Sequence, residues 1–127
     1  MKLGANRQKS QLSIGCFNAR SLCNKTCGVL EMLKDNSISI CCITETWLKT
    51  NDRAKFAEIR DFGFDIISAP RRGRGGGVGF LFNPKMISPV RNDVTKYSSF
   101  EVLECVIKTA GEIIRLCVVY RSTQAKA

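Results

Sequence analysis

The stretch "ISICCITETWL", residues 38–48, joins a run without charge directly to a carboxylate. Residues 38–43 carry no charged side chain and predict a strand buried inside a sheet. Glu45 follows two residues later, and Trp47 and Leu48 come immediately behind it. An ionisable group at the end of the most apolar segment indicates that the strand holds Glu45 at the edge of a sheet. We expect Trp47 and Leu48 to pack the loop behind it.

Strand and helix patterns alternate on the N-terminal side of this stretch. "LSIGCFN", residues 12–18, predicts a buried strand. Between the two strands, Val29, Leu30 and Leu33 recur at helical spacing, and Thr26 precedes them as the predicted N-cap.

A second helix is predicted after the stretch. Asp52 stands at its expected N-cap, Phe56, Ile59 and Phe62 form an apolar stripe, and Gly63 marks its end.

The remaining segments are strand-like. "FDIISAP" (64–70) ends in a proline, and a glycine-rich basic turn leads into a strand over 78–82. "FEVLECVIK" (100–108) and "EIIRLCVVY" (112–120) flank a short connection containing a glycine, which predicts a hairpin. Strand, helix, strand, helix and then strands predict an α/β fold, with parallel strands first and antiparallel strands later.

Length and composition fit one globular domain. The chain has 127 residues, of which 44% are hydrophobic and 24% charged. We expect a polar basic lead-in over residues 1–11, one domain over 12–121 and a tail over 122–127.

The net charge is +9, from 20 Lys and Arg against 11 Asp and Glu. An excess of positive charge favours polyanionic partners such as nucleic acid or an anionic membrane surface. The alternative is that the charge only keeps the protein in solution.

The cysteine pattern predicts reduced thiols. Five of the seven cysteines fall in strand-like segments and are expected in the core: Cys16, Cys41, Cys42, Cys105 and Cys117. Zinc is disfavoured, because Cys23 and Cys27 lack a second cysteine pair and the chain has no histidine. Residues 1–11 lack the apolar core of a secretory signal, and no segment approaches the length of a membrane span. We therefore expect an intracellular protein, nuclear or cytoplasmic and not secreted, without a membrane partner.

Three apolar strands end in a polar residue: Asn18, Glu45 and Tyr120. Ligands of open α/β sheets gather beyond the carboxyl ends of strands, so these side chains converge if the strands are neighbours. Glu45 would suit Mg²⁺ (or Mn²⁺), Asn18 would orient the carboxylate or a metal-bound water, and Tyr120 would position a phosphate. The alternative is a solvated glutamate, a turn asparagine and a core tyrosine with its hydroxyl in water.

The glycine-rich stretch "RRGRGGGVGF", residues 71–80, does not match the phosphate-binding loops that open a helix, because a strand follows it. A tight turn is the better interpretation. Arg71, Arg72 and Arg74 remain candidates for contacts with a nucleic-acid backbone, and so does Arg20.

"FNARSLCNK", "ITETWL", "RRGRGGGVGFLF", "FEVLE" and "VVYR", in this order, resemble the endonuclease domain of non-LTR (LINE-type) retrotransposons. That domain belongs to the endonuclease/exonuclease/phosphatase superfamily, together with apurinic endonucleases and deoxyribonuclease I. The resemblance implies an α/β sandwich that hydrolyses DNA phosphodiesters with Mg²⁺ and no small-molecule cofactor. It also implies that Asn18 and Glu45 form the metal site and that Tyr120 contacts the phosphate.

The family's later motifs, an Asp-x-Asn step and a terminal Ser-Asp-His, are missing from this sequence. We therefore expect the N-terminal half of a four-layer α/β sandwich, one mixed sheet with about two helices, inactive alone. A C-terminal half or a partner chain would supply the rest. Two alternatives stay open: a non-catalytic basic module that binds nucleic acid, and an unstable gene remnant.

Overall fold

The structure, a computed structural model, describes residues 12–71, 75–93 and 97–121. Its elements in chain order are β1 (Ile14–Asn18), α2 (Thr26–Asp35), β2 (Ile40–Thr44), α3 (Arg53–Asp61), β3 (Asp65–Ala69), β4 (Val78–Phe82), β5 (Val90–Asn92), β6 (Glu101–Lys108) and β7 (Ile113–Tyr120). The predicted α/β class is confirmed, with parallel and antiparallel pairing and two helices among the described residues. The predicted lead-in and tail lie outside those residues.

The strands form two sheets, and the prediction of a single mixed sheet was wrong. The first sheet has the order β1-β2-β4-β3, and the second has the order β5-β6-β7. β1 and β2 are parallel, whereas every other pair is antiparallel, as predicted. The reason for a second sheet is that β2 and β4 are buried at every position, so both faces of the first sheet need a cover.

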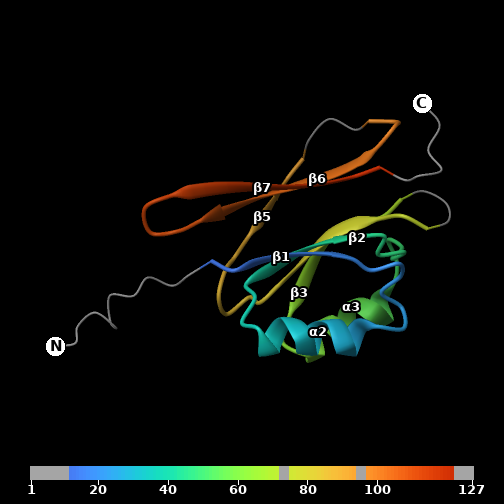
Figure 1. The fold of residues 1–127 in the computed structure, drawn as a ribbon, viewed down its shortest axis with the longest axis horizontal. Coiled ribbons are helices and arrows are strands. Elements are labelled where there is room, and N and C mark those ends of the chain that lie inside the picture. The colour runs from blue at the N-terminus through green and yellow to red at the C-terminus, as the bar shows by residue number, and fades with distance from the viewer. Residues whose placement is uncertain (1–11, 72–74, 94–96, 122–127) are drawn as a thin grey trace.

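Figure 1 shows this cover as layers: the hairpin of β6 and β7 lies over one face of the first sheet, and α2 and α3 lie under the other. Two apolar clusters correspond to the two interfaces. Between the helices and the first sheet, Leu30, Leu33 and Ile59 pack with Ile43 and Leu81.

Between the sheets, Ile40 and Phe80 of the first sheet pack with Leu103, Cys105 and Ile107 of the second. The strand over residues 40–44 is thus the centre of the molecule. Glu45 directly follows this fully buried strand.

The helix ends differ in part from their predicted caps. Thr26 is the first residue of α2 and not its cap, because its hydroxyl donates to the Leu22 carbonyl at 2.8 Å. Asp52 does occupy the N-cap position of α3, but its carboxylate accepts from the Lys49 backbone N–H at 3.0 Å. Gly63 follows the end of α3 with a φ of +95°, as expected for a helix stop.

All seven cysteines are free thiols, and three of the five predicted core cysteines are buried. Burial raises the pKa of Cys41 to about 12 and those of Cys42 and Cys105 to about 11, so these thiols stay protonated. The prediction was wrong for Cys16 and Cys117, which are exposed. Cys16 lies on an edge strand, and Cys117 pairs with Glu104 of β6.

The face of the second sheet turned away from the first exposes three large apolar side chains beside the Glu104–Arg115 ion pair. Val90, Ile113 and Val119 are 65%, 67% and 57% exposed. They alternate along the strands with the residues of the inter-sheet cluster, so they point outward. In the part of the chain that the structure describes, no helix is long and apolar enough to cross a membrane.

Candidate functional site

The three predicted strand-end residues meet at one carboxylate oxygen. Glu45 Oε2 accepts a hydrogen bond from the Asn18 amide Nδ2 at 3.0 Å and another from the Tyr120 hydroxyl at 2.5 Å. Asn18 ends β1, Glu45 follows β2 and Tyr120 ends β7, so the contact joins both sheets. Asn18 is exposed, and Glu45 and Tyr120 are half-buried, so the cluster is open to solvent.

The backbone around the cluster is held in an unusual conformation. Ser21 and Leu22 donate their N–H groups to the carbonyls of Glu45 and Thr46, at 2.7 and 3.0 Å. Glu45 itself has a φ of +54° and Trp47 one of +59°. Non-glycine residues with positive φ are uncommon and persist where surrounding structure fixes them, often at functional sites.

The glycine-rich turn supplies the other support. Thr46 and Trp47 donate their N–H groups to the carbonyls of Gly77 and Gly76, at 3.1 and 2.7 Å. Gly77 has a φ of +91°, and a Cβ there would lie 2.5 Å from Thr46 Oγ1. This confirms the prediction of a tight turn before β4 and gives it a purpose, because the turn holds the backbone beside Glu45.

Gly77→Ala is therefore expected to lower the free energy of unfolding by about 1–3 kcal/mol, from the strained φ and the contact with Thr46. Gly28→Ala is the matched control, because Gly28 lies within α2 with nothing within 4 Å of an added Cβ. It should stabilise the protein by about 0.5–1 kcal/mol. Urea unfolding checks both, and equal effects of the two substitutions would refute this account of the turn.

The environment of Glu45 favours its charged form. The hydrogen bond from Tyr120, then that from Asn18, hold the pKa of Glu45 below its usual value, and the nearby charges of Arg20 and Arg71 lower it further. The same hydrogen bond raises the pKa of Tyr120, because an ionised phenol would face the carboxylate. At neutral pH the site therefore presents a carboxylate beside a protonated phenol.

Two of the predicted arginines lie at this site. Arg20 is exposed, and its backbone N–H donates to Asn18 Oδ1 at 3.2 Å. Arg71 donates to Glu101 Oε2 from Nε at 2.9 Å and from a terminal nitrogen at 2.6 Å. Arg72 and Arg74 lie outside the described residues.

Glu101 is a residue of the site that the sequence analysis missed. Its other oxygen accepts from the Gly77 N–H at 2.7 Å, and in the sheet register it stands opposite Tyr120. One carboxylate thus ties Arg71 and the glycine-rich turn to the strand that carries Tyr120. The hairpin was predicted, and counting back from its turn would have placed Glu101 opposite Tyr120.

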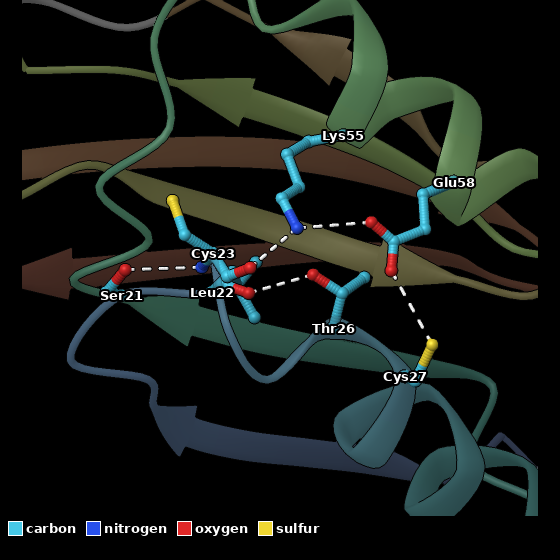
Figure 2. A network of polar contacts seen from close by, with 7 residues as sticks. All are labelled: Ser21, Leu22, Cys23, Thr26, Cys27, Lys55 and Glu58. Atoms are coloured by element: carbon cyan, nitrogen blue, oxygen red, sulfur yellow. Dashed lines mark hydrogen bonds and ion pairs between the residues drawn. The ribbon is translucent and has the colours of Figure 1, made fainter.

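A second polar network holds the loop between Asn18 and α2 against α3 (Figure 2). Lys55 Nζ donates to the Cys23 carbonyl at 2.6 Å and pairs with Glu58 at 3.1 Å. The other Glu58 oxygen accepts from the Cys27 thiol at 3.5 Å, which raises the pKa of that thiol. Lys55 therefore anchors the loop that carries Arg20 and Ser21.

The expectation for the residues behind Glu45 was right for Leu48 and wrong for Trp47. Leu48 is buried in the cluster between the helices and the first sheet, at 2% exposure. Trp47 is 45% exposed. The positive φ at Trp47 and its backbone bond to Gly76 turn the indole outward.

The donor set fits a weakly held hard cation. Among the described residues, no group of three or more His, Cys, Asp or Glu side chains is arranged to hold a metal. Mg²⁺ needs less, because it commonly takes one or two protein carboxylates and completes its coordination with water and substrate phosphates. An ionised Glu45 beside the Asn18 amide is such a set, whereas zinc would require more protein ligands.

The sequence matches no known protein-family model and no curated protein. Solved structures do match the fold. An AP endonuclease from Archaeoglobus fulgidus has a TM-score of 0.60 and 21% identity, over 83% of this chain and 40% of that one. TDP2 of D. rerio, complexed with single strand DNA product, has a TM-score of 0.66 and 13% identity, over 91% and 48%.

The 3' phosphatase NExo from Neisseria, bound to a product DNA hairpin, has a TM-score of 0.60 and 17% identity, over 83% and 40%. The chain thus has the fold seen in these structures. It spans less than half the length of each of these three proteins.

Proposed function

We propose that these residues form the metal- and phosphate-binding part of a divalent-metal-dependent DNA endonuclease of the retrotransposon type. The observation that carries the proposal is the convergence of Asn18 and Tyr120 on one oxygen of Glu45. Three polar side chains from both sheets meet at the strand ends, where α/β proteins bind ligands. The fold of the AP endonuclease, TDP2 and NExo structures, and the order of the sequence motifs, support DNA as the substrate.

Each residue has a role that its surroundings support. Glu45 stays ionised and provides the oxygen ligand for Mg²⁺ or Mn²⁺, and Asn18 fixes the orientation of its carboxylate. Tyr120 stays protonated and donates its one hydroxyl hydrogen to Glu45; a bound phosphate oxygen would replace Glu45 as the acceptor. The bound metal would polarise the scissile phosphate and neutralise its developing charge.

The 127 residues contain no histidine. The resemblance assigns generation of the nucleophile to a histidine and to the Asp of an Asp-x-Asn motif. We therefore propose that these residues bind the metal and the substrate but do not complete hydrolysis by themselves.

Glu45→Gln is expected to weaken Mn²⁺ binding by about tenfold or more, because the only carboxylate of the proposed metal site loses its charge. Mn²⁺ titration followed by electron paramagnetic resonance measures this. Supercoiled plasmid incubated with the same proteins and Mg²⁺ should show no nicking that depends on Glu45.

Glu112→Gln is the matched control. Glu112 is exposed and directly precedes β7, whereas Tyr120 is the last residue of that strand. It should bind Mn²⁺ like the unchanged protein. Equal Mn²⁺ affinity of the Glu45 and Glu112 variants would refute the metal site. Strong nicking that Glu45→Gln abolishes would instead refute the proposed inactivity.

The second candidate function is a basic module that binds nucleic acid without catalysis. The net charge of +9 and the exposed Arg20 favour it. It predicts DNA binding that requires neither Mg²⁺ nor Glu45.

A further inference from the structure

A groove of about 1170 Å³ opens beside the candidate site. It is lined by residues of three segments, 69–71, 91–93 and 97–103, together with Thr50 and Val78. Arg71 and Glu101 belong both to this lining and to the support of the Glu45 cluster. The groove therefore adjoins the candidate site and shares Arg71 and Glu101 with it.

The wall of the groove contains a stacked aromatic pair. The rings of Tyr97 and Phe100 lie 4.6 Å apart between centroids, with an angle of 15° between their planes. Tyr97 is 52% exposed, and Phe100 is half-buried. Phe100 thus supports one face of the Tyr97 ring, while the exposed surface of Tyr97 is available to a further planar group.

The charges of the groove are arranged around this pair. Arg91 pairs with Asp93 at 3.3 Å and donates to the Ser68 carbonyl at 2.9 Å, and Arg71 pairs with Glu101. Each arginine faces one acidic residue, so the two positive and two negative charges of the lining balance and neither carboxylate is left uncompensated. Two arginines and an exposed aromatic ring in one lining suit a ligand that carries both planar and anionic groups.

We propose that the groove binds single-stranded DNA, with one unstacked base on Tyr97 and the adjacent phosphates near Arg71 and Arg91. The identity of the polymer rests on the proposed function, whereas the stacking site rests on the groove itself. Proteins commonly hold single strands by stacking bases on aromatic side chains, because every base has a π-face. A duplex offers no such face unless a base leaves the stack, so single strands should bind more tightly.

The test is fluorescence anisotropy of a labelled 12-residue oligo(dT) and of a 12-base-pair duplex, in EDTA. The unchanged protein should prefer the single strand. Tyr97→Ala should weaken its binding by about 5- to 150-fold, which corresponds to the 1–3 kcal/mol typical for loss of one stacked base. Tyr97→Phe, which keeps the ring, should bind like the unchanged protein.

Tyr97→Leu keeps apolar bulk without a π-face and serves if the alanine variant does not fold. It should also weaken binding by about 5-fold or more. Met86→Ala is the matched control, because Met86 is an apolar side chain of similar exposure, 45%, and is not part of the groove lining. It should leave the affinity unchanged.

Three results would overturn the inference: equal affinity of Tyr97→Leu and unchanged protein, loss of binding in Tyr97→Phe, or equal affinity for the duplex. Failure of the Mn²⁺ titration would refute the metal site and leave the groove intact, and failure of the Tyr97 series would do the reverse.

Discussion

Phe80→Ala is expected to destabilise the protein by about 3–5 kcal/mol, the usual cost of removing a fully buried aromatic ring. Phe80 lies in the middle of β4, which is the third strand of the first sheet, and is 0% exposed. It belongs to the inter-sheet cluster with Leu103 and Cys105 of β6. The ring is therefore buried only if the second sheet covers the first, and the measured loss reports on that packing.

Urea unfolding followed by circular dichroism measures the effect. Phe62→Ala is the control, because Phe62 is a half-buried phenylalanine at the end of α3, in the other cluster. It should cost less than Phe80→Ala. A loss below about 1 kcal/mol at Phe80 would mean that the sheets do not pack face to face.

The same titration addresses the hypothesis of an unstable remnant. Two buried clusters on either side of one sheet favour a single cooperative transition. The exposed side chains of Val90, Ile113 and Val119 act against a stable monomer, because exposed apolar surface of this kind promotes association between molecules. A gradual transition already present in the unchanged protein would support the remnant hypothesis.

Local patterns were sufficient to predict most elements. The uncharged run over 38–43 and the helical spacing of Val29, Leu30 and Leu33 depend only on neighbours in sequence, and the structure has a strand and a helix there. The convergence of Asn18, Glu45 and Tyr120 was predicted on the condition that their strands are neighbours. That condition holds for β1 and β2, whereas Tyr120 reaches Glu45 from the second sheet. The roles of these residues remain predictions.

What the sequence did not predict depends on distant contacts. A strand pattern does not specify its partner, so the hairpin of β6 and β7 was assigned to the first sheet although it packs across it. Thr26 was expected to cap α2 because the competing acceptor, the Leu22 carbonyl, depends on the path of the preceding loop. Trp47 was expected inside because its apolar character suggests burial, whereas its backbone conformation turns it outward.

Binding of single-stranded DNA is expected to fall by roughly 10²- to 10³-fold between 50 and 500 mM salt. The estimate counts one phosphate contact for each of the four predicted arginines, Arg20, Arg71, Arg72 and Arg74, and a contact at Arg91 of the groove would add about −0.7 to the slope. Each phosphate contact on a single strand contributes about −0.7 to the slope of log affinity against log salt, so four give about −2.8. The double variant Arg72→Gln, Arg74→Gln should reduce the slope by about 1.4.

Arg53→Gln, Lys85→Gln is the matched control, because it removes the same charge from exposed positions on α3 and in the turn after β4. If it flattens the slope as much as the Arg72, Arg74 variant does, the net charge acts as a whole and the four arginines form no track.

The titration repeated with Mg²⁺ separates the two candidate functions. A basic module would lose affinity, since Mg²⁺ competes for the phosphates, and would do so equally in Glu45→Gln. A metal site at Glu45 would instead offset that loss, because a cation held there adds a phosphate contact, and Glu45→Gln would remove the offset.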